Sequence, residues 1–364
     1  MTTRIDHLKV HTVRVPLVRP FVTAVRRADQ IDAVLVEIVD NDGRCGWGEA
    51  AASWRVTGES PASIRAAVTG PLADVVVGRN AAEVPLLSDE LGRSVVHNSA
   101  ARSAVDCALY DLAAQYVGER LSTYLGGGDA PVRTDMTISA GGTDELVREA
   151  VDQCQNGFGV LKVKVGAGQD DANAVLAVRE AIGGEVVLRV DANQGWDEAQ
   201  AVRVIRFWED HDVSLEFVEQ PVAARCLDDL AAVTRQVDTP IMADEAVWTM
   251  HELNELMARR AADLVNVKLA KTGGITEALR VIGAARANDI GVMVGCMMES
   301  HVGIAASAAI AGTLAPADGV RAQDLDAGLW LRSSPVVGGA LYRHDVVVPA
   351  QAPGLGITGI ARGE

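Results

Sequence analysis

Two patterns of hydrophobic and polar positions meet at residues 126–128, where three glycines follow one another. Before them, residues 4–49 alternate apolar and polar side chains in short runs, which predicts an antiparallel hairpin or meander. Residues 60–125 instead repeat apolar side chains at helical spacing, and residues 99–118 predict one long helix. Strands followed by helices indicate an α+β unit in the first third of the chain.

After the glycines, short apolar runs alternate regularly with amphipathic stretches. The runs predict eight strands, at residues 133–139, 160–165, 186–191, 215–219, 240–243, 264–268, 292–296 and 320–325. The clearest helical patterns between them lie at residues 143–156, 197–210, 226–236 and 274–288. Parallel strands joined by crossover helices predict an α/β barrel of the TIM type.

The change of pattern divides the chain into three parts. Residues 1–128 are expected to form the α+β domain, and residues 129–330 the barrel. Residues 331–364 are rich in glycine and proline and return to an irregular or strand-like pattern. We expect this last segment to pack back on the first domain.

Three acidic residues each stand at the end of a predicted barrel strand: Asp191, Glu219 and Asp244. Carboxyl ends of successive strands meet at the catalytic face of such a barrel. Three carboxylates on adjacent strands would repel one another unless a cation lies between them. Oxygen ligands without histidine or cysteine suit Mg²⁺ or Mn²⁺. Asn193 and Gln220, close by in the sequence, could donate hydrogen bonds to these ligands.

Lysines stand on both sides of this predicted metal site. Lys162 and Lys164 are two apart on strand two and therefore point the same way, into the barrel. Lys268 ends strand six, half a turn around an eight-stranded barrel. A proton next to a carboxylate can be removed only if a cation stabilises the resulting ene-diolate. Two bases on opposite faces of one carbon are what a racemase or epimerase needs.

Composition narrows the classes of function. The 364 residues carry a formal net charge of -16 and 4% aromatic residues, which argues against non-specific nucleic-acid binding. Five scattered cysteines favour reduced thiols over a disulfide framework. The N-terminus does not resemble a signal peptide, and no apolar run approaches membrane-spanning length. We therefore expect a cytoplasmic protein that interacts with neither nucleic acid nor membrane.

Five short motifs resemble those of the enolase superfamily, and more closely its muconate-lactonizing subgroup: Lys162-Val163-Lys164, Asp191-Ala192-Asn193, Glu219-Gln220-Pro221, Ala243-Asp244-Glu245 and Val267-Lys268. The resemblance covers nearly the whole chain and implies a (β/α)7β barrel with an α+β capping domain. It implies Mg²⁺ at Asp191, Glu219 and Asp244. Lys164 and Lys268 would be the acid/base pair, assisted by Lys162, with Asn193, Gln220 and Glu245 around the ligands. Relatives often form homo-oligomers, which we also expect here.

The last predicted strand bears on the substrate. Asp324 and Asp326 place two carboxylates on one side of this strand, where they would hold a cation far from the metal. An Asp-x-Asp here resembles the ammonium-binding motif of dipeptide epimerases, whose first strand also resembles residues 134–139, with Thr137 near the substrate. Specificity loops are expected near residues 20–30 and 53–60. Arg26 matches in position an arginine that some members use on an acidic side chain, which would suit L-Ala-D/L-Glu-like dipeptides.

Other reactions on the same scaffold remain open. The lysines and the metal site suit an o-succinylbenzoate synthase, an N-succinylamino acid racemase or a muconate-type cycloisomerase equally well. Asp324 and Asp326 discriminate, because none of those substrates carries a free ammonium group. A non-catalytic binding role is disfavoured, because every position expected for catalysis is filled.

Overall fold

The computed structural model describes residues 4–23, 27–166, 170–314 and 321–361. Its N-terminal part begins with an antiparallel sheet of β1 (Ile5–Val22), β2 (Arg27–Asp40) and β3 (Cys45–Ala51), in that order. Helical elements follow: α1 (Pro61–Ala67), the π-helical turn η1 (Val68–Leu72), α2 (Ala73–Val76), α3 (Val84–Ser94), α4 (Ser99–Val117) and α5 (Leu121–Tyr124). The predicted α+β unit is confirmed.

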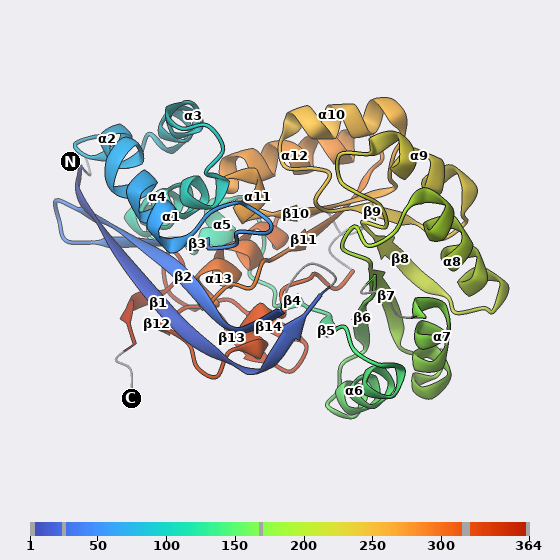
Figure 1. The fold of residues 1–364 in the computed structure, drawn as a ribbon. Coiled ribbons are helices and arrows are strands. Elements are labelled where there is room, and N and C mark those ends of the chain that lie inside the picture. Colours follow the sequence, from blue (N-terminus) through green and yellow to red (C-terminus); the bar gives the residue numbers. More distant parts are fainter. Residues whose placement is uncertain (1–3, 24–26, 167–169, 315–320, 362–364) are drawn as a thin grey trace.

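The second part is the barrel (Figure 1). In the described residues its parallel sheet runs in sequence order through β5 (Met136–Ile138), β6 (Val160–Lys164), β7 (Val187–Asp191), β8 (Leu215–Glu219), β9 (Ile241–Ala243), β10 (Leu264–Lys268) and β11 (Gly291–Gly295). Its helices are α6 (Thr143–Gln155), α7 (Asp171–Ile182), α8 (Glu198–Asp210), α9 (Leu227–Gln236), α10 (Met250–Arg259), α11 (Leu269–Thr272), α12 (Ile275–Ala287) and α13 (His301–Ala311). The α/β class and the modified TIM barrel are confirmed.

The eighth barrel position differs from the prediction. Within the described part of the expected strand, residues 321–325, Gln323 forms an isolated parallel bridge with Thr134 and Asp324 forms one with Gly295. The side chain of Gln323 accepts a hydrogen bond from the backbone N–H of Val294 at 2.8 Å, where a regular strand would offer a carbonyl group. This segment therefore closes the ring between β11 and the residues before β5.

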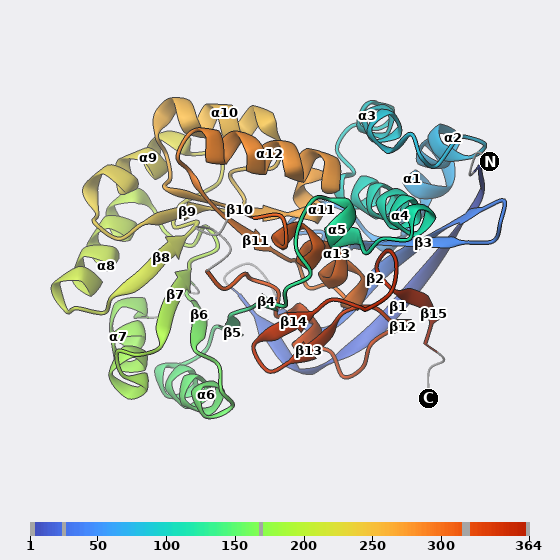
Figure 2. The ribbon, with the colours of Figure 1, turned by 180° about the vertical axis from the view of Figure 1, so that it is seen from behind.

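The C-terminal tail forms short strands of its own, which the sequence pattern did not resolve. After the 3₁₀ turn η2 (Ala327–Trp330) come β12 (Val336–Gly338), β13 (Leu341–Arg343), β14 (Val346–Val348) and β15 (Ile357–Ile360). Figure 2 shows β13 and β14 beside β4 (Val132–Arg133), with which β14 pairs. The tail also reaches the capping unit, where Leu355 N donates to Asp111 at 2.6 Å. These contacts support the predicted division of the chain, which stays a prediction.

Helix α4 packs between the capping sheet and the barrel and is buried along most of its length. It ends as predicted at Gly118, whose φ of 76° is left-handed and favours glycine. None of the described helices, α4 included, is long and apolar enough to cross a membrane. On the sheet side, Gly46 and Gly48 of β3 allow close approach, because a Cβ there would overlap the carbonyl oxygens of Ala108 and Ala104.

One carboxylate joins the two domains at the barrel mouth. Glu49, on β3, accepts hydrogen bonds from Ser300 N at 2.8 Å, Ser300 Oγ at 2.6 Å and Gly303 N at 2.9 Å. These groups belong to the first turn of α13, whose amide groups favour a negative charge. The capping sheet thereby fixes the segment between β11 and α13, which lines the site described below.

Substitution of Gly48 tests the close contact between β3 and α4. Gly48→Ala is expected to lower the free energy of unfolding by about 2–3 kcal/mol, because the added methyl group meets helix backbone that cannot move aside. Gly92→Ala, inside α3, is the control and should stabilise by about 0.5 kcal/mol, because its added methyl group would make only an ordinary contact with the end of the Arg102 side chain at 3.7 Å. Chemical denaturation measures both, and equal effects would contradict the assignment of this contact.

Candidate active site

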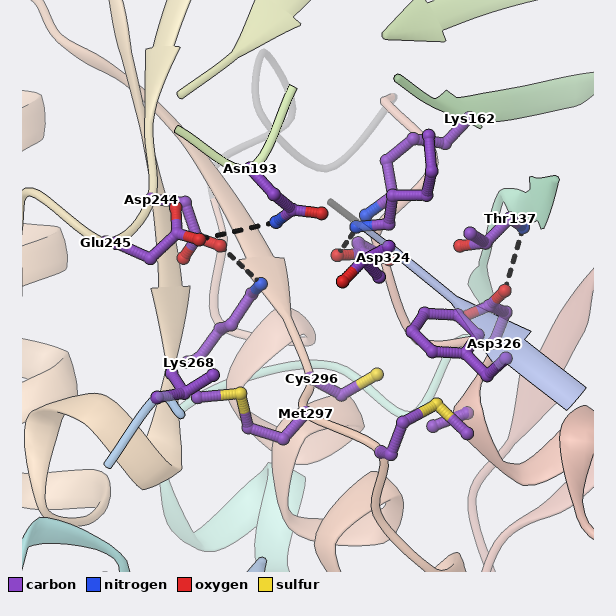
Figure 3. Close-up of a pocket in the computed structure, with 16 residues that line it drawn as sticks. Thr137, Lys162, Asn193, Asp244, Glu245, Lys268, Cys296, Met297, Asp324 and Asp326 are labelled. Atoms are coloured by element: carbon purple, nitrogen blue, oxygen red, sulfur yellow. Dashed lines mark hydrogen bonds and ion pairs between the residues drawn. The ribbon is translucent and has the colours of Figure 1, made fainter. Parts of the chain in front are cut away.

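A pocket opens at the carboxyl ends of the barrel strands, and Figure 3 shows the side chains that line it. One group of lining residues is charged or polar: Thr23, Thr137, Lys162, Lys164, Asn193, Asp244, Glu245, Lys268, Asp324 and Asp326. The other group is apolar or weakly polar: Phe21, Val56, Cys296, Met297, Met298 and Ala327. Phe21 and Val56 come from the segments expected to set specificity. Both domains thus contribute to one pocket.

Lys162 and Lys164 project from β6 into the barrel, as the alternation of strand side chains predicts, and both are buried. Lys164 Nζ lies 2.5 Å from Asp191 Oδ2 on the next strand. Lys162 Nζ lies 2.6 Å from Asp324 Oδ2 and 3.6 Å from Glu219 Oε2. Burial alone would lower the pKa of Lys162, but Asp324 and Glu219 raise it well above its ordinary value.

Lys268, at the end of β10, approaches the same pocket from the side opposite Lys162 (Figure 3). Its Nζ atom lies 2.7 Å from Asp244 Oδ2. Burial again favours a lower pKa, but Asp244 and Glu219 outweigh it and raise the pKa of Lys268. The two sides of the pocket therefore each present a buried lysine held by a carboxylate.

The predicted metal ligands lie side by side at the barrel mouth. Asp191 and Glu219 are in register on β7 and β8, and Asp244 follows β9 directly. Their oxygen atoms do not all lie within 4.8 Å of one another, since each carboxylate contacts a lysine or asparagine instead. Burial, reinforced by Asp191, raises the pKa of Glu219 to about 7. Burial alone would raise the pKa of Asp244, but Lys268 and Lys271 outweigh this effect and lower the pKa.

The residues expected around the predicted ligands lie there, but the side-chain N–H of Gln220 does not donate to these ligands as expected and donates to Val222 O at 2.9 Å. Asn193 N donates to Asp191 Oδ1 at 2.8 Å, and its side-chain amide donates to Glu245 Oε1 at 3.3 Å. Gln220 Oε1 accepts from Asp244 N at 2.9 Å. Both Asn193 and Gln220 have a positive φ, 42° and 38°, a conformation that is uncommon outside glycine. Burial and the nearby Asp244 raise the pKa of Glu245 to about 8.

Asp324 and Asp326 meet Thr137 at the other end of the pocket (Figure 3). Asp326 Oδ2 accepts hydrogen bonds from Thr137 N at 2.8 Å and from Trp330 Nε1 at 3.0 Å. Asp324 is held by Lys162. This brings together the residues predicted to contact the distal part of the substrate, apart from Arg26, which lies outside the described residues.

Sequence reasoning missed two buried residues that contact the predicted metal ligands. Lys271 Nζ lies 2.6 Å from Asp244 Oδ1 and donates to three carbonyl groups, those of Asp244, Val247 at 3.1 Å and Asn266 at 2.9 Å. Asn266 Nδ2 donates to Glu219 Oε1 at 2.7 Å. Two sequence signals were available. Asn266 is a polar residue in an apolar run, two positions before Lys268, so that it points inward as Lys268 does. Lys271 follows Lys268 by about one helical turn.

Five buried oxygen atoms around the predicted ligands have no hydrogen-bond partner in the described part of the chain: Asn193 Oδ1, Glu219 Oε2, Asp244 Oδ1, Glu245 Oε2 and Asn266 Oδ1. Such acceptors are costly to bury unless a cation or donor satisfies them. The surrounding donors are oxygen atoms, which suits Mg²⁺ or Mn²⁺. A divalent cation bound to Asp191 and Asp244 would compete with the lysines for the same carboxylate oxygens. The residues present therefore fit such a cation.

Opposed lysines and a row of carboxylates at a barrel mouth, beneath a capping domain, define an α/β-barrel enzyme of the enolase type. Residues 6–126 match the N-terminal domain described as mandelate racemase / muconate lactonizing enzyme. Residues 145–360 match the domain described as enolase C-terminal domain-like. The chain belongs to the mandelate racemase/muconate lactonizing enzyme family of this superfamily.

Individual relatives narrow the comparison. An L-Ala-D/L-Glu epimerase of Clostridium acetobutylicum is 38% identical over 98% of this chain and 99% of its own length. The solved L-Ala-D/L-Glu epimerase of Bacillus subtilis, a substrate-liganded complex, superposes with a TM-score of 0.95 at 37% identity, over 99% of this chain and 100% of that one. The structure of a dipeptide epimerase of Enterococcus faecalis, complexed with Mg and L-Leu-L-Tyr, superposes with a TM-score of 0.93 at 34% identity. The match covers 98% of this chain and 100% of that one.

Lys271 offers a test of how the site is held. Lys271→Met is expected to lower the free energy of unfolding by about 3 kcal/mol, because it removes a buried charge and leaves its carbonyl partners unsatisfied. Lys9→Met, which removes a half-exposed lysine paired with Glu37, is the control and should cost about 0.5 kcal/mol. Denaturation in Mg²⁺-free buffer measures both. A loss no larger than in the control would refute this role for Lys271.

Proposed function

We propose that this protein is a Mg²⁺-dependent dipeptide epimerase that inverts the α-carbon of the C-terminal residue. The observation that carries the proposal is the arrangement of charges along the pocket. Carboxylates suited to a cation lie at one end, lysines stand on both sides, and the Asp324–Asp326 pair lies at the other end. The relatives named above, which are epimerases acting on dipeptides, support it.

The charges fix the direction of the substrate. Its carboxylate would lie toward Asp191, Glu219 and Asp244, which would hold Mg²⁺. When bound there, Mg²⁺ would supply a Lewis acid that stabilises the negative charge developing on that carboxylate. The substrate's ammonium group would lie toward Asp324 and Asp326, as opposite charges in a buried site require. The α-carbon is then left between the lysines.

The lysines would carry the proton transfer. Lys164 or Lys268, whichever faces the hydrogen, removes the α-proton, and the lysine on the other face returns one from its own Nζ. A lysine can act as a base only when neutral. Asp191 and Asp244 now hold Lys164 and Lys268. Against the effect of burial, Asp244 raises the pKa of Lys268, so release from this carboxylate would favour the neutral form of Lys268. Lys162 stays paired with Asp324 and places a positive charge beside Lys164.

Side-chain preference rests on the capping segments. We propose an L-Ala-D/L-Glu-like substrate, in which Arg26 would pair with the acidic side chain; it follows Phe21 and Thr23, which line the pocket. Asp324 and Asp326 speak against o-succinylbenzoate synthase, N-succinylamino acid racemase and muconate-type cycloisomerase activity, because those substrates lack a free ammonium group. Homo-oligomerisation and a cytoplasmic location remain predictions from the sequence.

Exchange of the α-proton in D₂O tests the reaction. The Mg²⁺-loaded protein should incorporate one deuterium at the C-terminal residue of L,L- and L,D-dipeptides, read by mass spectrometry. Lys164→Ala and Lys268→Ala should each lower epimerisation by about 10²–10⁴-fold. Each variant should retain exchange with one epimer alone, because the remaining lysine faces one side of the carbon.

Lys9→Ala is the matched control for these variants, because Lys9 lies on β1 of the capping sheet and should leave turnover unchanged. Exchange with N-acylamino acids or dicarboxylates, and with no dipeptide, would replace the proposal with one of the alternatives. Full activity in both catalytic lysine variants would remove the two-base mechanism.

Binding of the cation can be measured without turnover. Mg²⁺ should stabilise the wild-type protein against thermal unfolding, by about 2.7 kcal/mol when its concentration is a hundred times the dissociation constant. Asp191→Asn should lose most of this stabilisation. Asp32→Asn, at an ion pair with Arg14 on the capping sheet, should keep it. Equal stabilisation of all three proteins would place the cation elsewhere.

A further inference from the structure

A third carboxylate lies behind the Asp324–Asp326 pair. Asp135 directly precedes β5, is fully buried, and points into the barrel one layer below Thr137. Oxygen atoms of Asp135, Asp324 and Asp326 all lie within 4.8 Å of one another, and we call these residues the carboxylate trio. Asp324 and Asp326 line the pocket, so Asp135 can act on a bound group only through them.

The partners of the trio are unequal. Asp135 Oδ2 lies 2.7 Å from Arg189 Nη1, whereas its Oδ1 atom is buried without a hydrogen-bond partner in the described residues. Arg189 is shared, because its Nε lies 2.7 Å from Glu216. Asp324 has Lys162 at 2.6 Å. The contacts of Asp326 are with neutral donors, Thr137 N and the Trp330 indole.

Counting charges shows an imbalance. Among the described residues, three carboxylates face two cations in direct contact, Lys162 and Arg189. If all three were ionised, one buried negative charge would lack a counter-charge, which is unfavourable in a low-dielectric interior. Either a proton or an additional cation must supply the missing charge. The titratable and charged groups farther around the trio are Lys164, Lys268, Cys296, Glu216, Glu299 and Tyr342.

The pKa directions show which carboxylates of the trio favour the protonated form. Burial, and then the charge of Asp324, raises the pKa of Asp135 to about 8, although Arg189 opposes the rise. The same two causes raise the pKa of Asp326. For Asp324, burial is outweighed by Lys162, and the pKa falls to about 2. The proton is therefore held by Asp135 or Asp326, and Asp324 stays ionised.

We infer that the trio holds one proton in the free enzyme and that the substrate's ammonium group displaces this proton on binding. The inference rests on the proposed function and makes Asp135 a positioning residue of the ammonium site. The proton leaves to solvent, and N–H groups of the ammonium then donate to Asp324 and Asp326. Substrate binding therefore competes with protonation of the enzyme.

The competition has a definite sign. At pH values below the raised pKa of Asp135, about 8, the trio must lose its proton before ammonium binds well. Affinity should therefore rise as the pH approaches about 8, by at most about tenfold per pH unit. Above about pH 8 the substrate's own amino group loses its charge, and affinity should fall again. Asp135→Asn has no ionisable side chain at position 135. Its affinity for the dipeptide should therefore not change with pH below about pH 8, and near pH 8 it should be about tenfold weaker than that of wild type.

Calorimetry in two buffers counts the proton directly. The Mg²⁺-loaded enzyme is titrated near neutral pH with the equilibrium mixture of both epimers of a dipeptide, once in phosphate and once in Tris, whose ionisation enthalpies differ. Wild type should release about one proton per bound dipeptide. Asp135→Asn should release close to none.

Glu216→Gln is the matched control. Glu216 holds the other side of Arg189, so this variant disturbs the same arginine but leaves the trio intact, and the proton should still be released. Loss of release in both variants would mean that Arg189, and not the trio, is responsible. Binding of a second Mg²⁺ per chain at the trio would also overturn the inference, because that ion would supply the missing charge.

Failure of this inference is separable from failure of the proposed function. Wild-type enzyme that exchanges the dipeptide α-proton but binds it without releasing a proton would overturn the inference alone. No exchange with any dipeptide would overturn the proposed function first. If Asp135→Asn does not fold, the two-buffer measurement on wild type and Glu216→Gln still decides the matter.

Discussion

The site depends on the pairing of charges among buried side chains at the barrel mouth. Lys162, Lys164 and Lys268 are buried, and each is held by a carboxylate on a neighbouring strand or on the closing segment. Burying a charged ammonium group without a partner costs much free energy, and the same holds for an unpaired carboxylate. The lysines and acids therefore stabilise one another, and the same pairing holds each side chain at the mouth where a substrate can reach it.

The charged side chains at the barrel mouth keep their positions because the barrel is closed and because the capping domain is bonded to it. The barrel closes without a regular eighth strand, through Gln323, whose side chain replaces a backbone acceptor. On the capping side, Glu49 binds the first turn of α13, and the glycines of β3 allow the sheet to approach α4. Phe21 and Val56 consequently lie over the same pocket as the barrel lysines. Side chains from the barrel and from the cap thus line one pocket.

Much of this could be predicted from the sequence, because the side chains proposed for catalysis occur at strand ends, and strand ends follow from hydrophobic periodicity. Lys162 and Lys164, two residues apart, had to point the same way. The sequence signals that Lys271 is unusual, but the partners of Lys271 and Asp135 could not be predicted. These partners are backbone carbonyls and an arginine 54 residues away, which tertiary packing alone brings near. The strand expected at 320–325 was wrong in detail for a similar reason: a glutamine side chain took part in its pairing.

The bridge made by Glu49 has a consequence for how such enzymes diversify. Because a capping-domain carboxylate closes the N-terminus of α13, a barrel separated from its cap would expose uncapped amide groups next to the pocket-lining segment at Met297 and Met298. Exchange of whole caps between relatives would therefore succeed only where the acceptor barrel offers the same helix start.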